Sequence, residues 1–156
     1  MGEADTRGPG LRFPPPLLAL GIIAVAWLAQ RWIPLPINTG ANLLLPGVLL
    51  VAIALLIAIT AIIQFKRAQT SVEPWKPTTS IIETGLFGYS RNPIYLAFCI
   101  ATAGIGLIIN SWWVILGLPI LVFLLWALVI RKEETYLEAR FEGVYLDYKQ
   151  RVRRWI

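Results

Sequence analysis

Four long apolar runs constrain the fold of this sequence more than any other feature. They span residues 17–33, 43–65, 94–109 and 112–130. A helix needs about 20 mostly apolar residues to cross a bilayer core roughly 30 Å thick, and it satisfies its own backbone hydrogen bonds in lipid. Because 57% of the residues are hydrophobic and only 15% are charged, too little polar surface remains for a soluble domain of this length. We therefore predict an all-α integral membrane protein with about four transmembrane helices.

The distribution of Lys and Arg predicts how these helices are oriented. Two of these residues precede the first apolar run, four lie between the second and third runs, and seven follow the fourth, whereas Arg31 alone lies on the other side. Cytoplasmic segments carry the excess of positive charge in membrane proteins. We expect both termini and the loop between the second and third helices in the cytoplasm. The short break at Asn110 and Ser111 predicts a tight hairpin of the last two helices.

After residue 130 the sequence changes to an amphipathic pattern. Apolar side chains recur at intervals of three and four, with charges between them, at Leu137, Phe141, Val144, Tyr145, Tyr148 and Val152. The pattern predicts a C-terminal amphipathic cytoplasmic helix, with Gly143 as a candidate kink. This helix either lies on the membrane surface or folds back over the loop. The chain would then consist of an N-terminal cytoplasmic tail (1–16), a two-helix membrane anchor (17–65) and a third region (66–156) that holds the loop, the hairpin and the C-terminal helix.

The polar stretch of residues 84–95 lies between long apolar runs and contains the residue types of a binding site. Gly85 and Gly88 permit turns or the close approach of a ligand, and Arg91 offers a rigid fork of hydrogen-bond donors. Pro93 is suited to the first turn of a helix, which also places Tyr95 in that turn. This stretch is therefore the first candidate for a functional site.

Glu133 and Glu134 lie where the fourth apolar run gives way to the charged C-terminal helix. A carboxylate half-buried at this boundary needs a counter-ion or a ligand. One interpretation is an ion pair with Arg91, Arg131 or Lys132. The other is a cytoplasm-facing pocket in which a carboxylate, a guanidinium and aromatic side chains meet. The sequence has no histidine and one cysteine, so we expect no metal site.

The order of these motifs resembles that of one enzyme superfamily. Thr-Gly-Leu-Phe at residues 84–87, then Arg91-Asn92-Pro93-x-Tyr95, a tight hairpin, and Glu133-Glu134 before the aromatic C-terminal helix look like the isoprenylcysteine carboxyl methyltransferase and phospholipid methyltransferase superfamily. The resemblance covers roughly residues 79–154. It implies a membrane-embedded enzyme whose catalytic core is the region 66–156. Such an enzyme transfers a methyl group from S-adenosylmethionine to a lipidic acceptor, a prenyl-like carboxylate or a phospholipid, at the cytoplasmic membrane face.

The resemblance also implies a set of cofactor-binding residues. Carried over by position, they are Ser80, Ile81, Ile82, Gly85, Phe87, Asn92, Pro93, Tyr95 and Glu133. In this set Glu133 holds the amino group or ribose of the cofactor, and Gly85 and Phe87 form the turn beneath it. The aromatic faces of Phe87, Tyr89 and Tyr95 suit the sulfonium cation of the methyl donor.

Three further residues are candidates for catalysis. The resemblance implies that Arg91 or Arg131 holds an acceptor carboxylate or phosphate, and Glu134 is available to take a proton from an amine acceptor. Two positions depart from the family pattern. Asn92 replaces the usual histidine, and Val129 stands where the eukaryotic prenylcysteine enzymes have an arginine. These departures leave the identity of the acceptor open.

Two other functions agree with the same residues. A membrane reductase of the sterol or steroid type has a similar Arg-His-Pro-x-Tyr element and a Tyr-rich tail, and it would bind a nicotinamide cofactor. A non-catalytic membrane subunit is the third function, supported by Asn92 and Val129. The methyltransferase is the leading prediction, with the membrane and a lipidic small molecule as its partners and no nucleic acid. The sequence predicts no oligomeric state.

Overall fold

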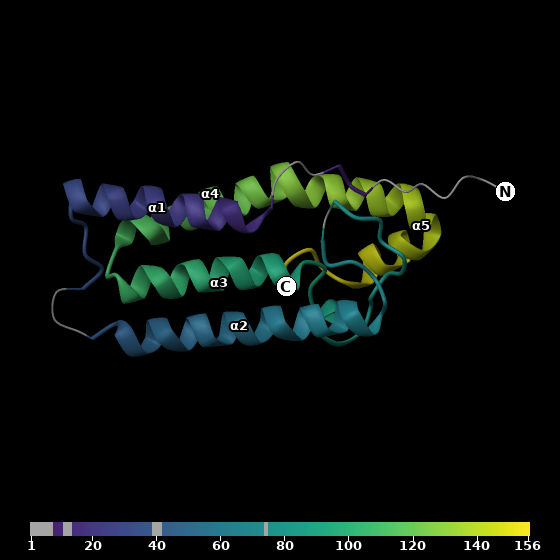
Figure 1. The fold of residues 1–156 in the computed structure, drawn as a ribbon, viewed down its shortest axis with the longest axis horizontal. Helices are drawn as coiled ribbons and strands as arrows, with labels where there is room; N and C mark the ends of the chain where they lie inside the picture. Colours follow the sequence, from purple (N-terminus) through teal and green to yellow (C-terminus); the bar gives the residue numbers. More distant parts are fainter. Residues whose placement is uncertain (1–7, 11–13, 39–41, 74) are drawn as a thin grey trace.

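The computed structural model describes residues 8–10, 14–38, 42–73 and 75–156, and every regular element among them is a helix. Helices α1 (Pro16–Trp32), α2 (Leu44–Arg67), α3 (Pro93–Ile108) and α4 (Trp112–Leu125) each begin within one residue of an apolar run (Figure 1). A short 3-10 helix, η1 (Gly85–Gly88), precedes α3. A π-helical turn, η2 (Trp126–Ile130), connects α4 to α5 (Arg131–Arg151). The predicted all-α class is confirmed for these residues.

Helices α1 to α4 lie side by side along the long axis of the molecule (Figure 1). α1 packs against α4 and α3, and α2 packs against the other side of α3. Gly47 of α2 and Gly104 of α3 allow the closest approach, because a Cβ added to Gly47 would lie 2.7 Å from the carbonyl oxygen of Gly104. Small residues commonly permit such close crossings of membrane helices. The main core cluster lies between α1, α3 and α4–η2 and consists of Ala19, Tyr95, Leu121, Leu125, Val129 and Ile130.

The predicted tight hairpin between α3 and α4 is present. Asn110 has a positive φ of 52°, and its side-chain oxygen accepts hydrogen bonds from the backbone N–H groups of Ile37 and Asn38, each at 3.0 Å. The indole of Trp113 donates to the carbonyl of Ile33 at 2.8 Å. These contacts tie the α1–α2 connection to the hairpin at the end of the bundle opposite α5 (Figure 1).

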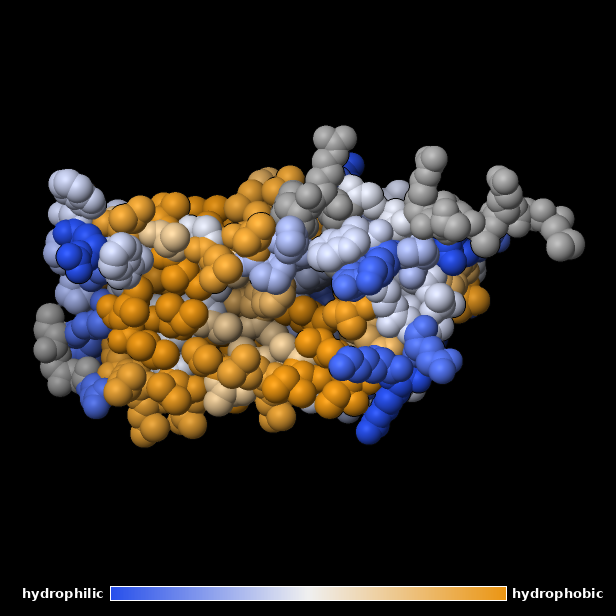
Figure 2. All heavy atoms as spheres, in the orientation of Figure 1, coloured by the Kyte–Doolittle hydropathy of each residue, from blue (hydrophilic) through white to orange (hydrophobic). Residues whose placement is uncertain are grey.

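Two helices among the described residues are long and apolar enough to cross a membrane: α2 and the continuous helix Trp112–Arg151. α1 and α3 are apolar but shorter. In Figure 2, apolar side chains cover the middle of the molecule and hydrophilic ones gather toward its two ends. Only Gly47, Ala54 and Ala61 of α2 are buried, so most of this apolar helix faces outward. An exposed apolar band of this kind is typical of a lipid-facing surface and indicates a membrane protein. The number of crossings and their orientation stay predictions.

α5 continues from η2 and bends sharply in its second half. Glu142, beside the candidate kink at Gly143, has the non-helical angles φ 44° and ψ −121°. The part of α5 after this bend turns back, and its buried Tyr145 and Tyr148 pack with Ile81 of the loop between α2 and α3. Of the two placements left open by the sequence, the structure has the one in which the helix folds over the loop.

Candidate functional site

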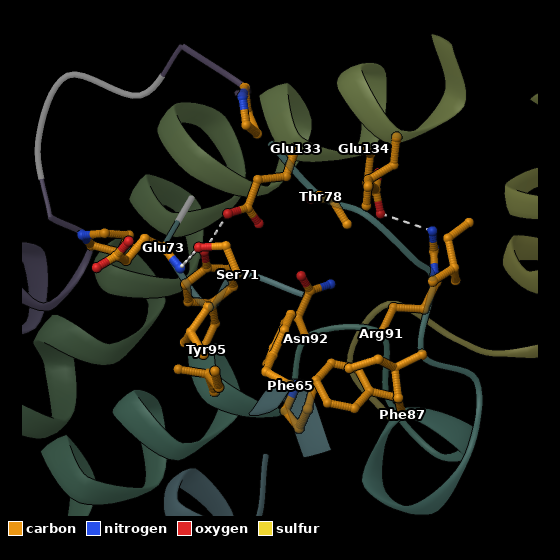
Figure 3. A pocket seen from close by; sticks show the side chains of 18 of the residues that line it. Phe65, Ser71, Glu73, Thr78, Phe87, Arg91, Asn92, Tyr95, Glu133 and Glu134 are labelled. Carbon is orange, nitrogen blue, oxygen red and sulfur yellow. Dashed lines mark hydrogen bonds and ion pairs between the residues drawn. The ribbon is translucent and has the colours of Figure 1, made fainter. Parts of the chain in front are cut away.

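A cavity of about 320 Å³ lies where the α2–α3 loop, the start of α3 and the start of α5 meet (Figure 3). This volume is at the lower end of the range for small-molecule sites. Most of the residues proposed from the sequence line it: Ser80, Ile81, Ile82, Phe87, Arg91, Asn92, Pro93, Tyr95, Glu133 and Glu134. The structure thus brings together the polar stretch before α3 and the paired glutamates of α5.

Glu133 points into this cavity and is bonded to α3 through Tyr95. The Tyr95 hydroxyl donates to a carboxylate oxygen of Glu133 at 2.6 Å (Figure 3). Burial raises the pKa of Glu133 from 4.5 to about 7, against the lowering effect of the Tyr95 hydrogen bond. Glu133 follows the apolar run that ends at Ile130 and makes no ion pair with the described part of the chain. It is therefore a carboxylate available to a cationic ligand.

Glu134, unlike Glu133, is paired with arginine side chains. Its two oxygens accept hydrogen bonds from Nε and Nη2 of Arg154 at 3.0 and 2.9 Å. Nη1 of Arg91 lies 2.9 Å from one of the same oxygens, and the side chains of Arg91 and Glu134 are only 8% and 10% exposed. The ion-pair interpretation of the sequence thus describes Glu134, whereas Glu133 has the surroundings of a ligand-binding group.

The turn that contains Phe87 is fixed from two sides. The side-chain amide of Gln64, near the end of α2, donates to the carbonyl of Thr84 at 3.1 Å and accepts from the N–H of Leu86 at 3.3 Å. The hydroxyl of Tyr148 in α5 donates to the carbonyl of Phe87 at 2.7 Å. These bonds hold η1 between α2 and α5 and place the ring of Phe87 at the cavity.

Gly85 and Arg131 are the two proposed site residues that do not line the cavity. Gly85 begins η1 with a φ of +61°, and an added Cβ would lie 1.7 Å from the amide nitrogen of Gln64. It therefore shapes the turn that carries Phe87. Arg131 is exposed and lies with Lys132 at a separate surface hollow. Tyr89 is 79% exposed and also lies outside the cavity.

The π-helical turn η2 directly precedes the two glutamates. A π turn holds one more residue than an α turn, so side chains after it are rotated relative to those of α4. Such turns often occur at functional sites. Val129 and Ile130 within η2 are fully buried, and Glu133 and Glu134 follow one turn later. Sequence reasoning missed this turn because its residues, Trp-Ala-Leu-Val-Ile, read as an ordinary apolar helix.

Part of the N-terminal segment also lines the cavity, as Pro9, Pro14, Pro15 and Pro16. We predicted a cytoplasmic tail here and assigned it no part in the site. Gly8 packs so closely on the loop that an added Cβ would lie 2.3 Å from the carbonyl oxygen of Trp75. Other lining residues not proposed from the sequence are Phe65, Ser71, Val72, Glu73, Trp75, Thr78, Ile94, Phe98, Leu137, Tyr145 and Tyr148. Tyr145 and Tyr148 reach the cavity because α5 folds over the loop, and the sequence carries no local signal for that fold.

Comparison with known families gives a match over residues 43–143, which include η1, the start of α3 and both glutamates. The matching family is described as phospholipid methyltransferase. The chain belongs to the phospholipid methyltransferase family. This assignment confirms the superfamily predicted from the order of the motifs.

Two curated proteins are similar to shorter segments of the chain. The chain is 36% identical over 75 residues to the protein-S-isoprenylcysteine O-methyltransferase of Saccharomyces cerevisiae, a match that covers 46% of the chain and 30% of the yeast protein. It is 46% identical over 41 residues to an uncharacterized protein of Haemophilus influenzae, which covers 26% of the chain and 65% of that protein. The chain thus spans less than two thirds of either relative. No solved structure matches it significantly.

Proposed function

We propose that this member of the phospholipid methyltransferase family transfers a methyl group from S-adenosylmethionine to a lipidic acceptor at the cytoplasmic face of the membrane. The observation that carries the proposal is Glu133. It is a partly buried carboxylate in a mostly apolar cavity, hydrogen-bonded to Tyr95 and without a counter-ion in the described residues. A ligand with positive charge would supply that counter-ion, and S-adenosylmethionine carries both an ammonium and a sulfonium group.

The residues of the cavity suit this cofactor. Glu133, with Tyr95 behind it, would receive the ammonium group. The ring of Phe87 offers an aromatic face to a cation, an interaction worth about 0.5–2 kcal/mol. Ser80, Ile81 and Ile82 form a wall of the cavity. Asn92 lines the same space, and its side-chain N–H group donates to the carbonyl of Arg154 at 3.0 Å, which leaves its side-chain oxygen as an acceptor for the cofactor.

The proposed reaction needs positioning more than acid–base chemistry. When bound, S-adenosylmethionine supplies an activated methyl group whose departure leaves a neutral thioether. Correct positioning of two reactants can lower a barrier by about 7–11 kcal/mol. Arg91 is the residue that would hold an anionic acceptor, because it lines the cavity and two of its guanidinium nitrogens have no hydrogen-bond acceptor in the described residues. Glu134 has both oxygens bonded to Arg154 and is thus already engaged. This arrangement favours an acceptor that arrives ionised, such as a carboxylate, and needs no base.

Binding of S-adenosylhomocysteine, the demethylated product, to detergent-purified protein tests the cofactor part of the proposal. Truncating one partner of a buried charge pair typically costs about 2–5 kcal/mol, and each 1.4 kcal/mol is tenfold in affinity. We therefore expect Glu133→Gln to weaken binding at least about 30-fold in calorimetry. Asp147→Asn is the matched control, because it removes an exposed carboxylate elsewhere on α5.

Methyl transfer to lipids is then followed by mass spectrometry in vesicles that contain either a prenylcysteine or an ethanolamine phospholipid. A folded protein that binds a nicotinamide cofactor and not S-adenosylhomocysteine would replace the proposal with the reductase. A folded protein that binds neither would favour the non-catalytic subunit.

A further inference from the structure

The four residues after α5, Val152 to Trp155, return to the start of α3 and are called the strap here (Figure 1). Two consecutive carbonyl groups of the strap hold the turn before α3. The carbonyl of Arg153 accepts from the backbone N–H of Arg91 at 3.0 Å, and that of Arg154 accepts from the side-chain N–H group of Asn92 at 3.0 Å. The hydroxyl of Ser90 also lies 3.5 Å from the Arg154 carbonyl. The turn before α3, which consists of Ser90, Arg91 and Asn92, thus contacts the strap through every one of its residues.

The next strap residue, Trp155, anchors the segment in the helical core. Its side chain packs against the cluster that contains Tyr95 and Leu125. Val152 at the beginning of the strap is buried beside Tyr145 and Tyr148. The strap is therefore held at both ends by apolar packing, and the carbonyl groups of its two middle residues face the residues before α3.

The side chain of Arg154, which is partly exposed, completes a group of three charges whose other two members, Arg91 and Glu134, are buried. It forms a two-point hydrogen bond with Glu134. Arg91 lies against the same carboxylate (Figure 3). Two cations and one anion leave this group with a net positive charge. Nη1 of Arg91 is within ion-pair distance of Glu134 but is not directed for a hydrogen bond, and neither Nη1 nor Nε of Arg91 has a hydrogen-bond acceptor in the described residues. Donors of a buried guanidinium are thus left for a ligand.

We propose that the strap positions the turn at the cavity and that Arg154 is a positioning residue that keeps Arg91 available to the acceptor. A carboxylate and a guanidinium prefer the two-point geometry, which only one arginine can adopt fully with Glu134. Because Arg154 adopts it, Arg91 retains unpaired donors. Without Arg154, Glu134 would draw Arg91 into the two-point arrangement and away from the acceptor. The statement about the acceptor rests on the methyl-transfer function proposed above.

Hydrogen exchange of the ligand-free protein tests the positioning role without any activity. In Arg154→Ala we expect the Arg91 amide, which donates to the strap, to exchange at least tenfold faster, while the amides of α2 and the middle of α3 stay unchanged. Arg153→Ala is the matched control. Its side chain is exposed, only its backbone carbonyl contacts the turn, and we expect exchange within twofold of the wild type. Equal exchange at Arg91 in the wild type and in Arg154→Ala would overturn the proposal.

Kinetics test the effect on the acceptor. We expect Arg154→Ala to raise the KM for the acceptor at least tenfold and to change the dissociation constant of S-adenosylhomocysteine less than threefold. Glu133 makes no bond to the strap, and the variant keeps the backbone carbonyl of residue 154 that accepts from Asn92. Arg154→Lys, which keeps the charge and is the variant to use if the alanine variant does not fold, should recover part of the KM. In a Glu134→Gln background the effect of Arg154→Ala should largely disappear, because the carboxylate that draws Arg91 away is gone.

Two outcomes of the kinetics would refute the role of Arg154. One is an equal loss of cofactor and acceptor binding in Arg154→Ala. The other is an undiminished effect of Arg154→Ala in the Glu134→Gln background. Failure of the wild type to bind S-adenosylhomocysteine would refute the methyltransferase instead, and hydrogen exchange would still decide whether the strap positions the turn.

Discussion

Lowering the pH is expected to weaken cofactor binding through one residue, Glu133. Its pKa is raised to about 7, with burial as the main cause. Only the ionised carboxylate can pair with an ammonium group, so a proton competes with the ligand at pH values below this pKa. The apparent dissociation constant is then multiplied by 1 + 10^(pKa − pH), which is about 1.3 at pH 7.5 and about 33 at pH 5.5. We expect S-adenosylhomocysteine to bind about 25 times more weakly at the lower pH.

Calorimetry between pH 5.5 and 7.5 measures this effect. Two variants test whether Glu133 is the group that causes it. Glu133→Gln cannot titrate, so its weaker binding should not change with pH over this range. Tyr95→Phe removes the hydrogen bond that lowers the pKa of Glu133, so the midpoint of the pH dependence should move above that of the wild type. The reasoning is refuted if Glu133→Gln keeps the pH dependence of the wild type, or if the wild type binds equally well at both ends of the range.

Two glycines give predictions about stability, each with a matched control. Gly85→Ala places a Cβ 1.7 Å from the Gln64 amide at a φ of +61°, so we expect a lower Tm and weaker cofactor binding. Gly88→Ala in η1 places a Cβ 3.4 Å from its nearest atom, the carbonyl oxygen of Glu83, and should be tolerated. Gly47→Ala brings a Cβ to 2.7 Å from the backbone of α3 and should destabilise the helix pair by about 1–3 kcal/mol. In Gly21→Ala the added Cβ has no atom within 4 Å. If this variant lowered the Tm as much as Gly47→Ala, the close packing of α2 on α3 could not be the cause.

The helices could be predicted from the sequence because apolar runs of this length have few alternative structures. The third run begins at residue 94 and α3 begins at Pro93, as the fixed φ of proline favours in a first helical turn. Gly143 marked the bend of α5 to within one residue, since the non-helical residue is Glu142. Local composition and periodicity were sufficient for these features.

The contacts that complete the candidate site could not be predicted in the same way. Arg154 is 20 residues from Glu134, and its approach depends on the bend at Glu142. The carbonyl groups of the strap bind through the backbone, which every residue type possesses, so the side chains there do not mark the contact. The different partners of Glu133 and Glu134 likewise depend on which side of α5 faces the strap. The π turn before them rotates the side chains of α5 about the helix axis, and the sequence did not indicate that turn.

The bond from Tyr148 to Phe87 has a consequence for the order in which the protein is made. The two residues are 61 positions apart, and a ribosome adds about 5–20 residues per second, so roughly 3–12 s separate their synthesis. During this interval the turn of η1 can be held by Gln64 of α2 but not by α5. The cavity is therefore completed only after the second half of α5 has left the ribosome, when the helices that precede it are already made.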